Sequence, residues 1–259
     1  MRAQLNKTIC CLAENSTITT NCHAANKLAR NVKLDNDLPT KQVKIVILGD
    51  STVQTYNDDD AMTAGWGQYI QKYFNENVEL RNHAIAGRST KTFIEQGHLD
   101  TALKDKATFA IIQFGHNDSH AKGRPESTNA QTDFKDYLRE YIKKFNYTGT
   151  TVILVTPMYR MTFRADGTLS DNLQPYANAM KGVATEQQCS IIDLHSSSKK
   201  LFIELGEKGC KKLQTNCKED RTHFGPEGAA AMAKLIIMEL AKTNSPLVEY
   251  IKKQKSDLI

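Results

Sequence analysis

Three residues of the chain have the chemistry that a serine-dependent hydrolysis requires. Ser51 supplies a hydroxyl, which is a weak nucleophile until a neighbouring base takes its proton. His223 is the candidate base, because an imidazole titrates close to neutral pH. Asp220 lies three residues earlier, within reach of the histidine Nδ1, where a carboxylate fixes the ring tautomer and stabilises the imidazolium. Together they predict a catalytic triad of Ser51, Asp220 and His223.

The tetrahedral intermediate of such a reaction needs hydrogen-bond donors for its oxyanion. The backbone N–H groups of Ser51 and Gly87 and the side-chain amide of Asn117 are candidates for this oxyanion hole. Alone, a glycine or an asparagine is typical of a turn, and an Asp-x-x-His pair is typical of a helix cap or a surface. The order and placement of all these residues favour the hydrolase interpretation.

A parallel sheet is the element that must bring these residues together. In an open α/β sheet, ligands bind at the carboxyl ends of the strands. Ser51, Gly87 and Asn117 each follow an apolar run that has the composition of a buried strand. The predicted strands are 43–48, 78–85, 109–114, 151–155 and 190–194.

Amphipathic helices are predicted between these strands. Apolar residues recur at helical spacing over 66–74, 134–145 and 173–183, and Pro226 can open a last long helix. Strands that alternate with helices predict a three-layer α/β/α domain with a five-stranded parallel sheet. We expect this domain to cover 41–259, and we expect 1–40, which is polar and without periodicity, to be an N-terminal extension outside it.

These segments resemble the SGNH (GDSL-type) hydrolase superfamily, whose four marked residues match Ser51, Gly87, Asn117 and His223. More narrowly, the chain is similar to the rhamnogalacturonan acetylesterase-like carbohydrate esterases. The resemblance implies a flavodoxin-like fold, metal-free deacetylation of a plant pectic polysaccharide without a cofactor, and secretion as the usual destination. It rests on 48–53, 65–68, 82–89, 113–118, 155–160 and 220–224.

Other side chains near the predicted strand ends are candidates for contact with the substrate. Arg88 and Arg160 can meet a galacturonate carboxylate, but pairing within the protein explains them equally well. His116 is a candidate for the same role, and it and Asp118 can instead brace their loop. The His116–His120 spacing looks like a metal motif, but zinc needs further ligands in the right geometry, and we expect no metal.

The bulk composition is ordinary for a globular protein. The 259 residues carry a formal net charge of +5, which favours acidic partners such as a polyuronide, although scattered lysines on helix faces explain it too. The sequence contains no nucleic-acid-binding motif and no apolar run near the roughly 18 residues of a membrane span. We expect no nucleic-acid partner, no membrane span, an acetylated polysaccharide or oligosaccharide as substrate, and a monomer.

The compartment and the cysteine pairing stay open. The longest apolar run near the N-terminus, 9–13, is shorter than the roughly 7–15 residues of a secretory signal core. The chain has no Cys-x-x-Cys pair of the kind that holds structural zinc. Cys210 and Cys217, just before Asp220, are either a disulfide or two thiols. The six cysteines are at 10, 11, 22, 189, 210 and 217.

Two other functions remain as alternatives to sugar deacetylation. A lipase-like esterase or a thioesterase would use the same triad on acyl chains, because neither the fold nor the triad fixes the substrate. Polar segments at the strand ends (57–60, 88–91 and 119–122) favour sugar. A catalytically inactive carbohydrate-binding protein is the second alternative, and the complete set of candidate residues argues against it. No Gly-x-Ser-x-Gly elbow is present, which argues against the α/β-hydrolase family.

Overall fold

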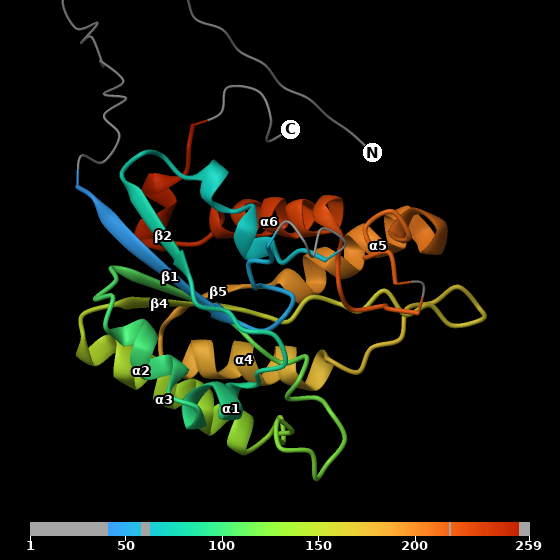
Figure 1. Ribbon diagram of the computed structural model, residues 1–259, viewed down its shortest axis with the longest axis horizontal. Helices are drawn as coiled ribbons and strands as arrows, with labels where there is room; N and C mark the ends of the chain where they lie inside the picture. The colour runs from blue at the N-terminus through green and yellow to red at the C-terminus, as the bar shows by residue number, and fades with distance from the viewer. Residues whose placement is uncertain (1–40, 58–62, 218, 254–259) are drawn as a thin grey trace, which may run out of the picture. The chain divides into compact units, whose positions relative to one another are not determined.

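The computed structural model describes residues 41–57, 63–217 and 219–253, and within them the core is a five-stranded sheet (Figure 1). All its neighbouring strands are parallel, in the order β2-β1-β3-β4-β5. The predicted α/β class and parallel sheet are therefore confirmed. The strands are β1 (Val43–Gly49), β2 (Val78–Asn82), β3 (Phe109–Gln113), β4 (Thr151–Val155) and β5 (Ser190–Ile192).

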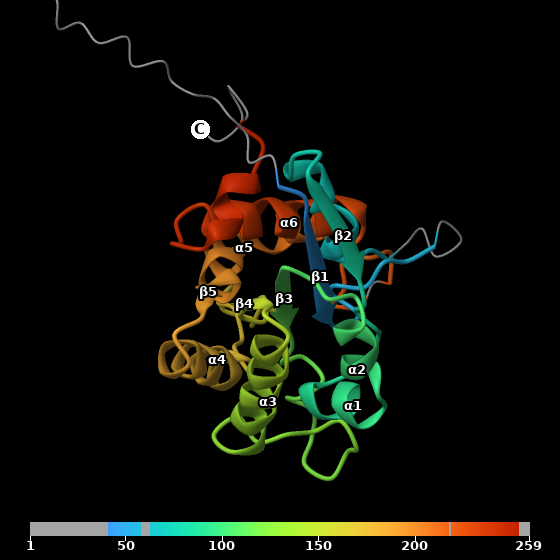
Figure 2. The ribbon, with the colours of Figure 1, turned by 90° about the vertical axis from the view of Figure 1, so that its left-hand side faces the viewer.

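Helices cover both faces of this sheet, as the side view shows (Figure 2). Alternate residues of one strand point to opposite faces: Ile45 and Ile47 of β1 pack in one apolar cluster, and Val46 and Leu48 pack in the other. The first face is covered by α5 (Leu194–Cys210) and α6 (Pro226–Leu240). The second is covered by α1 (Thr90–Glu95), α2 (His98–Leu103), α3 (Asp133–Tyr147) and α4 (Gln174–Glu186).

The helix predicted over 66–74 is replaced by two short 3-10 helices, η2 (Trp66–Gln68) and η3 (Gln71–Tyr73). The apolar side chains of this segment are buried as expected, Trp66 and Phe74 among them. Phe74 is extended, however, and bridges Ile251 near the C-terminus. Pairing with this distant segment, which follows the 3-10 helix η4 (Pro246–Tyr250), stops the helix from continuing.

Two other boundaries differ because polar side chains end the strands early. The strand predicted to reach residue 85 ends at Asn82, whose side chain accepts a hydrogen bond from Ala84 N (3.1 Å). Leu194, predicted as the end of a strand, begins α5, because Asp193 caps that helix by accepting from Ser196 N (3.1 Å). Such local side-chain hydrogen bonds are typical of strand ends and helix starts.

The carboxyl ends of β1 and β3 lie side by side, since Gly49 pairs with Gln113. The segment after β2 is joined to them by a hydrogen bond from Ile85 N to Gly49 O (3.0 Å). The loops that carry Ser51, Gly87 and Asn117 therefore leave the sheet at one edge. The predicted extension, 1–40, lies outside the described residues, and so does most of the polar segment 57–60. None of the helices described is both long and apolar enough to cross a membrane.

Candidate active site

Ser51, His223 and Asp220 form a continuous chain of hydrogen bonds. His223 Nε2 lies 2.7 Å from Ser51 Oγ, and His223 Nδ1 lies 2.7 Å from Asp220 Oδ2. Ser51 is in the turn that ends β1, and the other two residues are in the segment before α6. Two segments separated by about 170 residues of sequence thus meet with a hydroxyl, an imidazole and a carboxylate in line. This is the arrangement in which a histidine can take the serine proton.

The carboxylate of Asp220 is held by its own loop. Its Oδ1 accepts hydrogen bonds from the backbone N–H groups of Thr222 (2.7 Å) and His223 (2.9 Å). Burial alone would raise the pKa of Asp220, but these two donors and the His223 ring outweigh it and hold that pKa below its usual value. Asp220 therefore stays ionised and oriented toward Nδ1 of His223.

Neighbouring segments fix the loop that carries His223. Phe224 is fully buried and bridges Ala64 and Gln214. Arg160 donates through Nε to Thr222 Oγ1 (3.1 Å), and its backbone neighbour Met161 donates to Arg221 O (2.8 Å). The histidine is thus attached to a buried anchor on one side and to the segment after β4 on the other.

Gly87 and Asn117 lie in adjacent turns. Gly87 has φ +74°, a conformation that favours glycine, although a Cβ there would meet no atom within 4 Å. Asn117 Nδ2 donates to Arg88 O (2.9 Å), which ties its loop to the Gly87 turn. An amide nitrogen carries two hydrogens, so the second is free to meet an oxyanion. The role of these groups as an oxyanion hole stays a prediction.

The side chain of Asp118 holds the loop of Asn117 in place through hydrogen bonds. It is fully buried and accepts hydrogen bonds from Thr90 Oγ1 (2.5 Å), Thr128 Oγ1 (3.0 Å) and Gly115 N (3.1 Å). Burial raises the pKa of Asp118 to about 7, even though the hydrogen bonds from Thr90 and Thr128 oppose the increase. This carboxyl therefore changes its protonation in the neutral range.

The Asp118→Asn variant is expected to change the pH dependence of stability. In the wild type the folded state holds this proton up to about pH 7, whereas an ordinary aspartate loses it near 3.8. The contribution of Asp118 to the free energy of unfolding is therefore fully present below pH 3.8 and is lost as the pH rises toward 7, by roughly 4 kcal/mol in all.

Urea unfolding of both proteins between pH 4 and 8 measures this effect, whatever fixed change in stability the substitution itself causes. The variant should gain stability relative to the wild type as the pH rises. Parallel stability curves over the whole interval would contradict the raised pKa.

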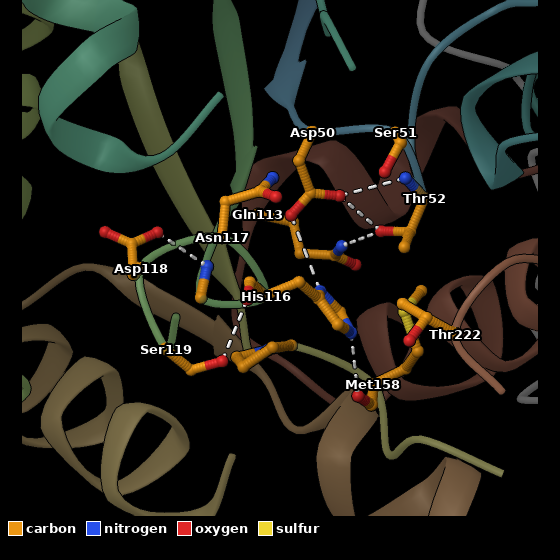
Figure 3. A network of polar contacts seen from close by, with 12 residues as sticks. Asp50, Ser51, Thr52, Gln113, His116, Asn117, Asp118, Ser119, Met158 and Thr222 are labelled. Carbon is orange, nitrogen blue, oxygen red and sulfur yellow. Dashed lines mark hydrogen bonds and ion pairs between the residues drawn. The ribbon is translucent and has the colours of Figure 1, made fainter. Parts of the chain in front are cut away.

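A buried polar network lies behind the nucleophile turn (Figure 3). Trp66 Nε1 donates to Gln113 Oε1 (2.9 Å), and Gln113 Nε2 donates to Thr52 Oγ1 (2.8 Å). Thr52 in turn donates to Asp50 Oδ1 through its hydroxyl (2.7 Å) and its backbone N–H (2.9 Å). Sequence reasoning gave these residues no role, although all lie in the segments that carry the family resemblance. They hold the end of β1 against the end of β3.

The three predicted substrate-contact residues all have partners within the chain. Arg88 donates to Ala86 O and Gln96 Oε1, each at 2.9 Å. Arg160 donates to His116 O (3.0 Å) as well as to Thr222. His116 is 3% exposed, and its Nε2 lies 3.2 Å from Met158 O. The structure thus shows the pairing that the sequence left open, and contact with the substrate stays a prediction.

Two further expectations concern metals and cysteines. Within 41–57, 63–217 and 219–253, no group of three or more histidine, cysteine or acidic side chains is placed to hold a metal ion. Cys210 and Cys217 are free thiols, so the structure agrees with the thiol alternative for this pair. Cys210 is buried, with Sγ 3.7 Å from Phe202 O, and packs as part of the core.

Comparison with known proteins gives the family. A family model described as GDSL-like lipase/acylhydrolase matches residues 45–236, a span that contains every candidate residue from Ser51 to His223. The chain belongs to the GDSL-like lipase/acylhydrolase family. It is therefore a carboxylic ester hydrolase, and the recognition of this family from the sequence is confirmed.

Two relatives match most of the chain. A probable rhamnogalacturonan acetylesterase of Bacillus subtilis (strain 168), YesY, is 36% identical over 82% of this chain and 98% of its own length. The rhamnogalacturonan acetylesterase RhgT of the same organism is 32% identical over 82% of this chain and 95% of its own length. The crystal structure of Bacillus subtilis YxiM superposes with a TM-score of 0.67 at 29% identity, over 79% of this chain and 57% of that one.

Proposed function

We propose that this GDSL-like hydrolase is a serine esterase that removes acetyl groups from an O-acetylated plant polysaccharide, with rhamnogalacturonan as its substrate class. The observation that carries the proposal is the contact of 2.7 Å between Ser51 Oγ and His223 Nε2 at the edge of the sheet where ligands bind. The substrate class is supported by the two rhamnogalacturonan acetylesterases that are similar to this chain over most of their length.

The first half of the reaction transfers the acetyl group to the enzyme. As Ser51 Oγ attacks the acetyl carbonyl carbon, its proton passes to His223 Nε2, and Asp220 stabilises the resulting imidazolium. The carbonyl oxygen becomes an oxyanion, which accepts hydrogen bonds from the N–H groups of Ser51 and Gly87 and from the Asn117 amide. When the intermediate collapses, the C–O bond to the sugar breaks, and the sugar oxygen takes the proton from His223.

The second half releases acetate by the same route. A water molecule attacks the acetyl-serine carbonyl and gives a proton to His223 Nε2, and the second oxyanion forms against the same three donors. Collapse then breaks the bond to Ser51 Oγ, which recovers its proton from His223. Acetate leaves, and the free enzyme is restored. Apart from the ester and one water molecule, every group in this scheme belongs to the chain.

We also propose that residues 41–259 form the hydrolase domain and that 1–40 is an extension of it. Two observations support the boundary. The family match begins at residue 45, and the first described element, β1, begins at Val43.

Acyl-chain selectivity tests the class of substrate. Each CH₂ group that a longer acyl chain buries contributes about 0.8 kcal/mol, so an enzyme with an apolar trough would strongly prefer octanoate. Polar side chains lie near Ser51, Asn117 and Thr222 among them (Figure 3). We therefore expect kcat/KM for p-nitrophenyl acetate to exceed that for the octanoate by well over tenfold.

The polymer is tested by measuring acetate release from acetylated rhamnogalacturonan, acetylated xylan and acetylated homogalacturonan. The proposal expects acetylated rhamnogalacturonan to react fastest.

If p-nitrophenyl octanoate were hydrolysed as fast as p-nitrophenyl acetate, or faster, the result would instead support the lipase-like or thioesterase alternative. No turnover of any ester would support an inactive carbohydrate-binding protein.

A further inference from the structure

A second aspartate–histidine pair lies directly behind the candidate oxyanion hole. Asp50 precedes the nucleophile Ser51, and His116 precedes Asn117. Asp50 is fully buried and His116 is 3% exposed, and Asp50 Oδ2 lies 3.4 Å from His116 Nδ1. Figure 3 shows this contact between the end of β1 and the loop after β3. The pair therefore joins the two segments whose spacing defines the site.

The other polar atoms of this pair have defined roles. Asp50 Oδ1 accepts two hydrogen bonds from Thr52. His116 Nε2 lies 3.2 Å from Met158 O, and a carbonyl oxygen only accepts, so Nε2 must carry a hydrogen to make that bond. Asp50 Oδ2 and His116 Nδ1 are then left facing each other, both buried and without another partner among the described residues.

Without one further proton, this contact would set two lone pairs against each other. A neutral histidine with its hydrogen on Nε2 presents a bare Nδ1 to an ionised carboxylate. Leaving a buried polar atom unsatisfied costs about 1–3 kcal/mol, and more for a charged group. Moving the hydrogen to Nδ1 repairs this contact only by leaving Nε2 bare against Met158 O. A proton between Oδ2 and Nδ1 satisfies both contacts at once.

We propose that Asp50 and His116 share one proton between Oδ2 and Nδ1 and act as a positioning pair that holds Asn117 in register with Ser51. This inference rests on the proposed role of Asn117 as an oxyanion donor. The shared proton also makes the pair electrically neutral overall. Without that proton the pair would place a full negative charge beside the site where the oxyanion develops.

Burial and neighbouring charges act on the pKa of each member of the pair. Burial would raise the pKa of Asp50, but His116 and Thr52 outweigh it and keep that pKa low. Burial lowers the pKa of His116 and Asp50 opposes this, while the charge of Arg160, and that of His223 when it is protonated, add to the lowering. Asp118 is an acidic neighbour of the pair, and the Asp50 charge raises the pKa of Asp118.

The pair acts through the position of Asn117, so breaking it should affect the transition state more than substrate binding. A misplacement of about 1 Å in an active site can reduce the rate roughly 100-fold. The His116→Phe variant keeps a ring of similar size but makes neither hydrogen bond. We expect its kcat to fall roughly 10- to 100-fold, with KM changed by less than about twofold.

Asp50→Asn is the conservative variant. Its oxygen can keep both bonds from Thr52, and its amide can donate to a bare His116 Nδ1, so the link survives without a movable proton. Its kcat should therefore fall much less than that of His116→Phe. His83→Phe is the matched control, because His83 Nε2 contacts Asp105 Oδ2 (2.6 Å) in a histidine–aspartate pair that does not join Ser51 to Asn117; its kcat should stay within about twofold of the wild type.

Nuclear magnetic resonance of the protein labelled with ¹⁵N-histidine reads the proton directly and independently of turnover. The wild type should show a hydrogen on His116 Nε2 and a second, slowly exchanging proton at Nδ1. In Asp50→Asn the Nε2 hydrogen should remain, while Nδ1 becomes a bare acceptor.

Two results would overturn the proposal that Asp50 and His116 share a proton and position Asn117. One is a wild-type His116 in which either ring nitrogen, Nδ1 or Nε2, is bare, and the other is a His116→Phe variant that retains as much kcat as His83→Phe. Turnover that persists in Ser51→Ala would instead overturn the proposed function and leave the nitrogen assignments standing. If His116→Phe fails to fold, the wild-type and Asp50→Asn spectra still decide the question.

Discussion

Replacing Ser51 with alanine is expected to lower kcat by roughly 10⁶-fold, and His223→Ala should lower it by a similar factor. The two residues act as a unit, because the serine is not activated without the histidine, and the histidine has no nucleophile to activate without the serine. Asp220→Ala should lose less, roughly 10⁴-fold, since Asp220 orients the ring and stabilises its charge but transfers no proton.

Initial rates on p-nitrophenyl acetate measure this ranking, with Ser170→Ala as a control outside the candidate site. Combining Ser51→Ala with His223→Ala should add little to either single loss, because each already abolishes the same step. A result in which Asp220→Ala costs clearly more than His223→Ala would contradict the assigned roles. So would losses that multiply in the double variant.

The second large effect concerns Asn117. Removing one oxyanion donor typically lowers kcat by about 10²- to 10³-fold, or roughly 2.7–4 kcal/mol. The bond from the Asn117 amide strengthens as negative charge develops on the substrate oxygen, so Asn117→Ala should reduce kcat far more than it changes KM. The bond from Asn117 Nδ2 to Arg88 O is lost as well, which should cost about 0.5–1.5 kcal/mol of stability.

Asn117→Asp separates the oxyanion role from a purely structural one. A carboxylate of nearly the same volume repels the oxyanion, so this variant should be at least as slow as Asn117→Ala. If Asn117→Ala raised KM and left kcat unchanged, Asn117 would be a substrate-binding residue, and the oxyanion donors would be elsewhere.

The sheet was predictable from the sequence because its central strands β1, β3 and β4 are almost entirely buried. The run 151–155 is rich in β-branched residues and apolar after Thr151, and it became β4 without a change of boundary. The predictions failed where a distant contact or a local cap decided the structure. The segment 66–74 has helical periodicity, but Phe74 pairs with Ile251, and no pattern within 66–74 indicates a partner so far along the chain.

The long helix α5 was missed for a related reason. Its buried side chains are few, including Leu194, Ser198 and Phe202, and Gly206, at φ +63°, interrupts it. Weak apolar periodicity and an interior glycine hide a helix from sequence reasoning. The capping aspartate Asp193, which accepts from Ser196 N, was the available signal.

For the site, the sequence identified the residues that react better than the residues that hold them in position. Ser51, His223 and Asp220 were predicted to meet, and the structure places them in hydrogen-bond contact. Asp50 and Gln113 could not be assigned in the same way. Their distant partners, His116 for Asp50 and Thr52 for Gln113, become neighbours only after β1 and β3 pair. An aspartate or glutamine that braces a strand end looks like any other polar residue in the sequence.

The claim that Ser51 is the nucleophile is tested most directly by covalent labelling. A fluorophosphonate reacts with a serine that an adjacent base has activated, and digestion followed by mass spectrometry identifies the labelled residue. The account predicts a single modification, at Ser51, that is absent from Ser51→Ala and strongly slowed in His223→Ala. Labelling of another serine, or undiminished labelling of the Ser51→Ala protein, would contradict it.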